Sequence, residues 1–345
     1  MNRSQPRGVE ARPPRETTAL FGHADAERTF LAAYRGGRMP HAWLVGGPPG
    51  VGKATLAYRV ARFVLAHPDS SAQDVQAAPT LALDSTHPVA RRIAAQAHPD
   101  VLTLERTAGP GGTLRSVITV DEVRRTVGFF GSTAGAGGWR VCIVDSADDL
   151  QNPQGANALL KVLEEPPSRA LFLLISHAPG RLLATIRSRC RRLILRPLEA
   201  SEVAQAAAQA LERDPTDVEV LKAAEAARGS VARAATLLGG AALAVRERMI
   251  ELLGGLPQID PQALHALGDT LGRSDDTVFS TFVETIQDWL SAQLHVRGTQ
   301  PARLAPVAEV WEKLDRAARD VEVFNLDRKP MVFAVFGLLA EAARH

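Results

Sequence analysis

The sequence predicts an α/β domain built on a parallel sheet, followed by a region made only of helices. Between residues 41 and 197, short apolar runs alternate with segments of helical spacing, and this pattern stops at Pro197. Continuous apolar strands that alternate with helices are typical of a parallel sheet covered on both faces. The chain is therefore expected to be α/β up to Pro197 and all-α beyond it.

Five short apolar runs are the expected strands. They occupy residues 41–47, 100–105, 139–145, 170–176 and 191–197. Apolar residues at helical spacing predict the helices that alternate with them. These helices are expected within 30–39, 53–67, 118–130, 152–166 and 180–190, with one more near 88–97 inside an irregular insertion over 68–98.

Changes of composition along the chain predict its domains. The 345 residues are enough for two or three domains. Residues 1–17 are rich in Pro and Arg and are expected to be disordered. The α/β domain is expected over 18–197, a small Ala-rich helical domain over 198–244, and a domain of longer helices over 245–345.

The overall composition argues against several classes of protein. The net charge is +2 with 23% charged residues, so no global charge predicts binding to nucleic acid or to a membrane surface. Two cysteines, Cys142 and Cys190, cannot form a four-cysteine zinc site or a disulfide framework. No apolar run approaches the roughly 18 residues of a membrane span. We expect a reduced, cytoplasmic protein without zinc and without a membrane segment.

Residues 47–55, with the sequence GPPGVGKAT, nearly match a phosphate-binding loop. The pattern G-x-x-x-x-G-K-[ST] is expected between a strand and a helix, as it is here. Glycines let backbone N–H groups point at phosphate oxygens, the helix N-terminus favours an anion, and the lysine adds a positive charge. Nucleotide contacts are expected from Gly47, Gly50, Val51, Gly52, Lys53, Ala54 and Thr55.

One departure from the loop pattern concerns the metal that accompanies ATP. Ala54 replaces the Ser or Thr whose hydroxyl normally holds Mg²⁺. Thr55 cannot take its place, because neighbouring residues of a helix point about 100° apart. ATP and Mg²⁺ stay candidate cofactors, but the site is expected to bind the metal weakly.

A second departure follows the expected strand 139–145. Asp145 ends that strand and can reach the Mg²⁺ shell. A Glu usually follows it and polarises the attacking water, but here the next residue is Ser146, which is no general base at neutral pH. Asp148 and Asp149 are interpreted as solvated acids that cap a helix. The site is therefore expected to turn ATP over poorly.

Arg189 lies after an expected helix and before the last strand, at an edge of the α/β domain. From such an edge an arginine could stabilise phosphoryl transfer on ATP held by a neighbouring subunit. It could equally be a surface charge in a basic run with Arg187, Arg191 and Arg192. The residues alone leave both interpretations open.

Several segments together carry a resemblance to a known family. They are residues 37–65, 118–124, 141–167, 174–190 and 324–336, and they include LLKVLEEPP and the triplet Ser188, Arg189 and Cys190. In this order the chain resembles the delta-prime subunits of the bacterial DNA polymerase III clamp loader, which are AAA+ proteins. The triplet alone is a weak signal, but at this spacing after LLKVLEEPP it is a strong one.

This resemblance implies a RecA-like α/β nucleotide domain, a helical lid and a helical collar that assembles the subunits. It implies a stator without ATPase activity of its own, whose Arg189 acts in trans on ATP held by a motor subunit of the gamma/tau type. A delta-type subunit, the sliding clamp and primed DNA are the other implied partners. Ser176 falls at the first sensor position, and the lid sensor falls at Ala232, with Arg233 one residue late. The family's four-cysteine zinc module has no counterpart in residues 66–100.

Three other functions are weighed against this one. An active motor ATPase of the same machine is disfavoured by Ala54 and Ser146. A P-loop kinase or another nucleotide-metabolising enzyme would need several arginines around the phosphates and would not need a helical C-terminal domain. A pure DNA-binding module is disfavoured because Trp and Tyr are few and scattered.

Overall fold

The computed structural model describes residues 12–109, 112–131, 138–296 and 301–344. The described chain divides into two compact units, with the division between Ala235 and Thr236 inside helix α10 (Val231–Leu238). We call residues 12–235 the α/β unit and residues 236–344 the helical unit. The domain boundaries expected at 197/198 and 244/245 stay predictions.

Five parallel strands form the sheet of the α/β unit. They are β1 (Ala42–Gly46), β2 (Val101–Glu105), β3 (Arg140–Asp145), β4 (Ala170–Ser176) and β5 (Arg191–Ile194). Their order is β2-β3-β4-β1-β5, and every pairing is parallel. All residues of β1 and β4 are buried, as their continuous apolar sequences predicted. The five predicted strands and the parallel sheet are confirmed.

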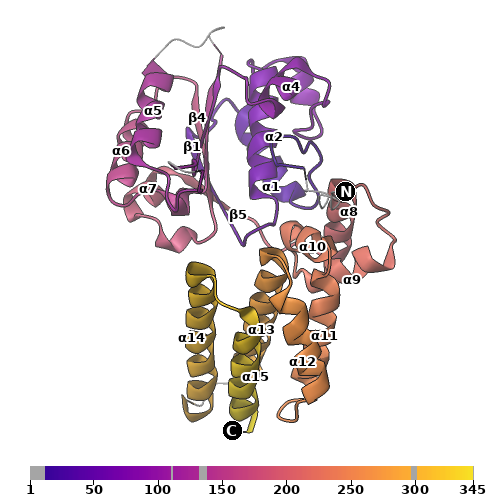
Figure 1. The fold of residues 1–345 in the computed structure, drawn as a ribbon. Coiled ribbons are helices and arrows are strands. Elements are labelled where there is room, and N and C mark those ends of the chain that lie inside the picture. Colours follow the sequence, from indigo (N-terminus) through magenta and orange to yellow (C-terminus); the bar gives the residue numbers. More distant parts are fainter. Residues whose placement is uncertain (1–11, 110–111, 132–137, 297–300, 345) are drawn as a thin grey trace, which may run out of the picture. The chain divides into compact units, whose positions relative to one another are not determined.

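Helices cover both faces of this sheet. Figure 1 shows α1, α2 and α4 on one face and α5, α6 and α7 on the other. Neighbouring residues of a strand point to opposite faces, so Trp43 and Val45 of β1 join the apolar core under α1 and α2, whereas Leu44 joins the core under α5 and α6. This arrangement confirms the predicted RecA-like AAA+ fold class. The helices are α1 (Ala24–Arg35), α2 (Lys53–Ala66), α3 (Gln73–Ala77), α4 (Pro88–Ala94), α5 (Val120–Gly131), α6 (Gln154–Glu164) and α7 (Ala184–Arg189).

Some details of the α/β unit differ from the sequence prediction. α1 begins at Ala24, ahead of the predicted segment 30–39, and ends at Arg35 before Gly36. The insertion over 68–98 holds α3 as well as the predicted helix α4. Short 3₁₀ turns follow β3 (Ala147–Asp149) and β4 (Pro179–Arg181). Residues 131–138, whose Gly-rich sequence predicts a turn, fall largely outside the described residues.

Two further helices of the α/β unit follow the last strand, ahead of α10. They are α8 (Ala200–Leu211) and α9 (Val218–Ala226), and they pack against each other. α8 begins with a capping box, in which the Glu199 carboxylate accepts a backbone N–H of the first turn and the Glu202 carboxylate accepts the N–H of Glu199. The predicted change from strands to helices near Pro197 is confirmed.

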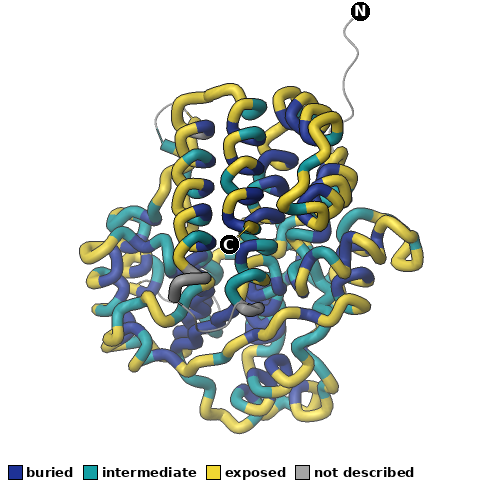
Figure 2. The backbone as a smooth tube through the Cα atoms, turned by 90° about the horizontal axis from the view of Figure 1, so that it is seen from below, coloured by how far each residue is buried: buried dark blue, intermediate teal, exposed yellow. Residues whose placement is uncertain are grey.

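The helical unit contains longer helices, as its sequence predicted. They are α11 (Ala242–Gly254), α12 (Pro261–Gly272), α13 (Asp276–Val296), α14 (Pro301–Phe324) and α15 (Arg328–Arg344). α13 packs against α11 and α14, and α15 packs against α12 and α14. Figure 2 shows buried turns on the sides of these helices that face one another and exposed turns on their outer sides.

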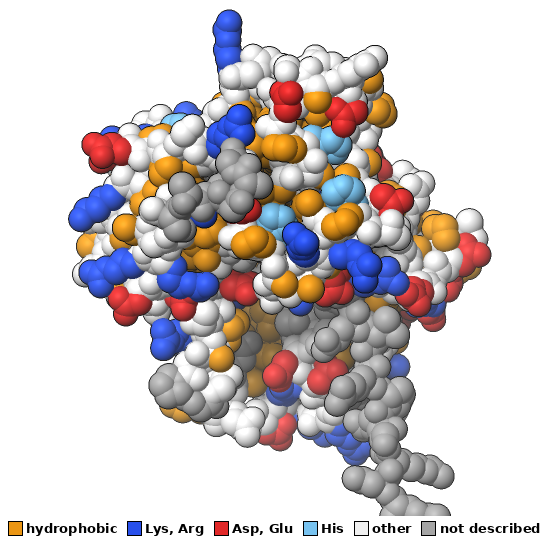
Figure 3. Space-filling model, turned by 90° about the horizontal axis from the view of Figure 1, so that it is seen from above, with side chains coloured by type: hydrophobic (Ala, Val, Ile, Leu, Met, Phe, Trp, Pro, Cys, Tyr) orange, Lys and Arg blue, Asp and Glu red, His pale blue; other side chains and the backbone are white. Residues whose placement is uncertain are grey.

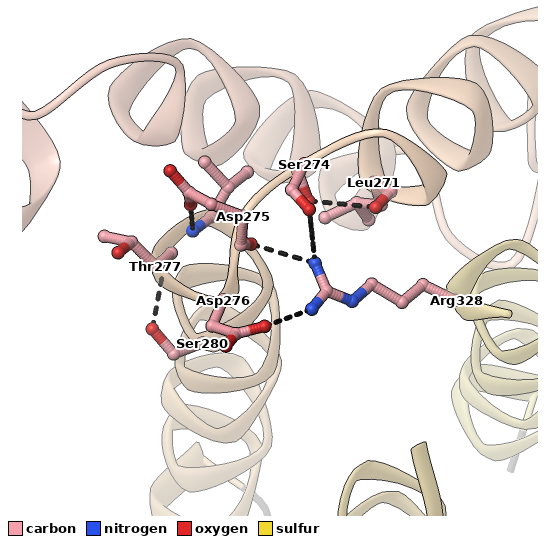
Figure 4. Close-up of polar contacts among 8 residues, drawn as sticks. Leu271, Ser274, Asp275, Asp276, Thr277, Ser280 and Arg328 are labelled. Carbon is pink, nitrogen blue, oxygen red and sulfur yellow. Dashed lines mark hydrogen bonds and ion pairs between the residues drawn. The ribbon is translucent and has the colours of Figure 1, made fainter. Parts of the chain in front are cut away.

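Arg328 connects three elements of the helical unit. Its guanidinium donates to the carbonyl oxygens of Ser274 at 2.6 Å and Asp275 at 2.9 Å, and it pairs with the Asp276 carboxylate (Figure 4). It also lies over the Phe279 ring, 4.8 Å from the ring centroid. Arg328 thereby fixes the first turn of α15 to the end of α12 and the start of α13.

Two observations bear on binding to a membrane or to nucleic acid: the length and hydropathy of the described helices, and the distribution of charge on one face. No helix within the described residues is both long enough and apolar enough to cross a membrane. On the face seen in Figure 3, Lys and Arg side chains are mixed with Asp and Glu. That face presents no continuous basic surface among the described residues.

Candidate functional site

The candidate site is built around the loop that connects β1 to α2. Gly47, Gly50 and Gly52 have φ angles of 146°, 74° and 99°, which residues with a Cβ rarely adopt. Gly50 also lacks room for a side chain, because a Cβ there would meet Ser230 and would lie 2.8 Å from the Cβ of Ala232. The loop shape therefore requires glycine, and helix α10 contacts the loop directly.

The start of α10 contacts this loop through its backbone and through a small side chain. The backbone N–H of Val231 donates to the carbonyl oxygen of Gly50 at 2.9 Å. Ala232 lines the pocket at the loop, whereas Arg233 is not among the residues that line it. Helix α10 therefore contributes the methyl group of Ala232 to the wall of this pocket.

Lys53, the loop lysine, is engaged by the loop itself. Its amine donates to the carbonyl oxygens of Gly47 at 2.7 Å and Pro48 at 2.6 Å, and the residue is only 3% exposed. Burial lowers the pKa of Lys53 to about 8, although Asp145 and Asp148 favour its charged form. An incoming phosphate would have to draw the amine away from these two carbonyl groups.

A pocket of about 410 Å³ lies over the loop. This volume falls within the range of roughly 300–1,000 Å³ that is usual for small-molecule sites. Among the predicted nucleotide contacts, Gly47 and Ser176 do not line the pocket, and neither does Arg189. The predicted residues that do line it are Gly50, Val51, Gly52, Lys53, Ala54, Thr55 and Asp145.

One wall of the pocket comes from residues 12–21, which we call the N-terminal strap. Arg62 of α2, only 2% exposed, donates to the carbonyl oxygens of Arg15 at 2.6 Å and Thr17 at 2.8 Å. Arg59 donates to the carbonyl oxygen of Thr18 at 2.5 Å. Burial lowers the pKa of Arg62 to about 10. Residues 12–17 of the segment expected to be disordered are thus held by α2, while residues 1–11 lie outside the described residues.

Asp145 ends β3 and lines this pocket, and Ser146 is the next residue of the chain. Burial raises the pKa of Asp145, with His177 and Lys53 opposing the rise. The Ser146 side chain is buried, and its hydroxyl has no hydrogen-bond partner among the described residues. With Ala54 at the metal-ligand position, the loop lacks the hydroxyl oxygen that normally holds Mg²⁺, an ion that takes oxygen ligands in octahedral geometry.

No group of three or more His, Cys, Asp or Glu in the described parts of the chain is arranged to hold a metal ion. Both cysteines, Cys142 and Cys190, are free thiols in the apolar core. The expected absence of zinc stays a prediction, because it concerns the protein in solution.

The interpretation of Asp148 as a solvated cap is wrong. Its carboxylate accepts three hydrogen bonds from the end of β4: from the Ser176 hydroxyl at 2.9 Å, the His177 N–H at 2.6 Å and the Ala178 N–H at 3.2 Å. Burial raises the pKa of Asp148, but these hydrogen bonds bring it below its ordinary value. Asp148 is thus bound to the end of β4, and the Ser176 hydroxyl is oriented toward this carboxylate. Asp149, by contrast, pairs with Arg106 at 3.3 Å.

Arg189 is the last residue of α7 and lies away from its own phosphate loop. The register of β5 pairs Arg191 with Trp43 near the start of β1, and the loop follows Gly46 at the other end of β1. A strand of five residues spans about 13 Å, which an arginine side chain cannot bridge. The guanidinium instead pairs with Glu164 at 2.7 Å and donates to the carbonyl oxygen of Thr185 at 2.9 Å.

The chain is similar to subunits of a bacterial DNA polymerase. The family described as "DNA polymerase III, delta subunit" matches residues 22–199. A Pseudomonas aeruginosa protein named DNA polymerase III subunit delta' is 35% identical over 233 residues, which are 67% of this chain and 65% of that protein. A Mycobacterium tuberculosis protein named DNA polymerase III subunit gamma/tau is 33% identical over 178 residues, which are 51% of this chain and 28% of that protein. The match therefore spans less than two thirds of either relative.

A solved structure gives a weaker similarity. A DNA polymerase III gamma subunit-related protein from Thermotoga maritima aligns with a TM-score of 0.43 at 19% identity, over 91% of this chain and 100% of that chain. This similarity is too low to add to the argument from the strands.

Proposed function

Because the chain belongs to the DNA polymerase III delta-subunit family, we propose that it is a clamp-loader subunit of the delta-prime type. It serves as a stator: it assembles with the other subunits, provides Arg189 to ATP on an adjacent motor subunit, and hydrolyses no ATP itself. Its partners are gamma/tau-type motor subunits and a delta-type subunit. With them it helps load the sliding clamp on primed DNA in the bacterial cytoplasm.

One observation carries the proposal that the chain's own site is not catalytic: the residue after Asp145 is Ser146, whose hydroxyl is no general base at neutral pH. Ser146 occupies the position of the usual Glu, and the nearby Asp148 already accepts three hydrogen bonds. A general base must reach the attacking water with a lone pair available. Ala54 adds the loss of the metal ligand. Two independent parts of hydrolysis are thus absent.

The pocket still supports binding of a nucleotide. Gly50 and Gly52 carry no side chain that could block the loop backbone, and the loop leads into the N-terminus of α2, where an anion is favoured. The pocket volume of about 410 Å³ is sufficient for a ligand of this size. We propose that ATP binds there weakly, because Lys53 must first leave the carbonyl groups of Gly47 and Pro48.

Assembly through the helical unit is supported by an exposed apolar turn. Val323 and Phe324 end α14, Leu326 lies in the turn before α15, and these residues are 73%, 67% and 51% exposed. Neighbouring exposed apolar side chains commonly mark a protein interaction site. Phe324 and Leu326 lie in the segment 324–336 that carries part of the family resemblance, and we propose that this region belongs to the collar.

The second candidate function is an active motor subunit of the same machine. Lys53 and the open pocket favour it, because both are needed for ATP hydrolysis. It predicts phosphate release by the isolated chain, whereas the stator predicts none. The two candidates therefore differ in a direct measurement.

The experiment combines turnover and assembly. We expect steady-state phosphate release by the purified chain to equal the buffer background, and we expect the chain to co-elute with the motor and delta-type subunits. Turnover of about 1 s⁻¹ or more, abolished by Lys53→Ala, would establish the motor function instead. Failure to co-elute with either subunit would reject the assignment to the clamp loader.

A further inference from the structure

We propose that Glu164 holds the Arg189 guanidinium in a parked position and releases it when a phosphate on the neighbouring subunit competes for it. This proposal rests on the proposed trans role of Arg189. It adds a regulatory contact within the chain: a carboxylate that limits how often the arginine is available before the complex engages its substrate. Glu164 is thus a positioning residue, not a catalytic one.

The two partners come from different helices that are both anchored. Glu164 is the last residue of α6, whose Leu159 and Leu163 are buried in the core, and Pro166 follows shortly after. Arg189 is the last residue of α7, whose Ile186 is buried in the same core. Because α6 and α7 pack against each other, the separation of the two backbones is fixed. The carboxylate is therefore held where the guanidinium can reach it.

The guanidinium is held from two directions. Its Nη2 lies 2.7 Å from a Glu164 carboxylate oxygen, and its Nη1 donates to the carbonyl oxygen of Thr185 at 2.9 Å. Arginine has five N–H donors in a planar fork, and phosphate and carboxylate compete for the same edges of that fork. A phosphate that forms two parallel hydrogen bonds with Arg189 would therefore displace Glu164.

The contact is weak enough to be reversible. The side chains of Arg189 and Glu164 are 34% and 48% exposed, so water screens the pair. Exposed ion pairs contribute about 0–1 kcal/mol, and 1.4 kcal/mol corresponds to a factor of ten. Glu164 can thus reduce the population of available Arg189 by about fivefold at most. The contact would therefore lower basal turnover only modestly, and a docked ATP could still displace Glu164 from Arg189.

The test uses the reconstituted complex with Glu164→Gln, which removes the charge and keeps the shape. We expect ATP turnover without clamp and DNA to rise about two- to fivefold, with little change in the stimulated rate. Glu165→Gln is the matched control, since this exposed neighbour forms no ion pair with any residue that the structure describes. The double variant Glu164→Gln/Arg189→Ala should behave as Arg189→Ala alone, because the effect passes through the arginine.

The possible failures are distinguishable. If Arg189→Ala leaves turnover unchanged, the trans role fails and the parking contact fails with it, whereas the assignment to the clamp loader is tested separately by co-elution. If Arg189→Ala lowers turnover but Glu164→Gln leaves the basal rate unchanged or lowers it, only the parking contact is rejected. An equal rise with Glu165→Gln would also reject it, because a general change of surface charge would then explain the result.

A second measurement needs no activity. Phenylglyoxal labels available guanidinium groups, and peptide mass spectrometry reports the labelling rate of each arginine in the folded chain. We expect Glu164→Gln to accelerate labelling of Arg189 about two- to fivefold relative to Arg192 in the same sample. Equal rates in the wild type and the variant would overturn the proposal.

Discussion

The phosphate loop and the edge that carries Arg189 differ in how far their charged side chains are buried and in which groups bind them. At the loop, Lys53 is buried against two carbonyl groups of its own loop, and Ser176 donates to Asp148. At the edge, Arg189 is partly exposed and is held by one carboxylate and one carbonyl group. Groups satisfied within the chain support its structure, whereas a charge left near the surface can act on another molecule. This difference is what a subunit that assists ATP hydrolysis elsewhere requires.

The largest effect is expected from Arg189→Ala. An arginine that acts in trans contributes about 10³-fold or more at the ATP site it serves. The variant should remain folded and should assemble, while the clamp- and DNA-stimulated turnover of the complex falls in part, because the other ATP sites have their own arginines. Steady-state phosphate release by the reconstituted complex measures this loss.

Arg192→Ala is the control for that prediction, since Arg192 is an exposed basic neighbour on β5. If the two variants have equal small effects, the edge is only a basic surface and the contrast with the phosphate loop disappears. Loss of assembly in Arg189→Ala would give the residue a structural role instead.

Asp148→Asn should destabilise the loop region. The carboxylate accepts three hydrogen bonds, and loss of such a charged acceptor costs about 1–3 kcal/mol. The pKa of Asp148 is lowered in the folded protein, so its stabilisation is present above the ordinary Asp value of about 3.9. The stabilisation is lost as the pH falls through the lowered value. Urea unfolding over a series of pH values should show the full difference between wild type and variant at pH 7 and a smaller difference as the pH falls below about 3.9.

Asp149→Asn provides the comparison for Asp148. Asp149 pairs with Arg106 at 3.3 Å, and both side chains are partly exposed. Such pairs contribute about 0–1 kcal/mol. If the two substitutions lower the free energy of unfolding equally, the hydrogen bonds at the end of β4 stabilise the protein no more than an exposed ion pair does.

The affinity for ATP should decrease as the pH rises through about 8. Burial lowers the pKa of Lys53 to about 8, so the amine is charged below this pH and neutral above it. An anion favours the charged form, and loss of one such contact weakens binding by roughly tenfold. Equilibrium dialysis with labelled ATP at pH 7 and pH 9 measures the change. Lys53→Gln should bind weakly at both values, and a pH dependence that persists in this variant would assign the titration to another group.

The smallest effect is expected from removal of metal. Neither the loop nor the Arg189 edge is expected to depend on zinc, because the two cysteines are buried free thiols. Chelation should leave the midpoint of thermal unfolding unchanged. Stoichiometric zinc in tag-free protein, or a lower midpoint after chelation, would reveal a site that the sequence does not predict.

Local patterns in the sequence were sufficient to predict the strands of the sheet and the position of the phosphate loop. The strands are continuous apolar runs, and the loop follows β1 within a few residues, so both depend on neighbours in the chain. The contacts of Asp148, Arg62 and Arg189 were not predicted. Asp148 reaches Ser176 across 28 positions, and Arg62 reaches Thr17 across 45. A single sequence contains no signal for such pairs, because each residue is an ordinary surface type at its own position.

The attachment of the N-terminal strap has a consequence for how freely its sequence can vary. Arg62 and Arg59 bind the strap through the carbonyl oxygens of Arg15, Thr17 and Thr18, and every amino acid supplies a carbonyl oxygen. Side chains at these positions can therefore be exchanged among orthologues while the strap keeps its place. The guanidinium of Arg62 cannot be exchanged in the same way, because it is buried and its hydrogen bonds hold several carbonyl groups together. The side chains that the strap presents to the pocket can therefore change while its hydrogen bonds to Arg59 and Arg62 stay the same.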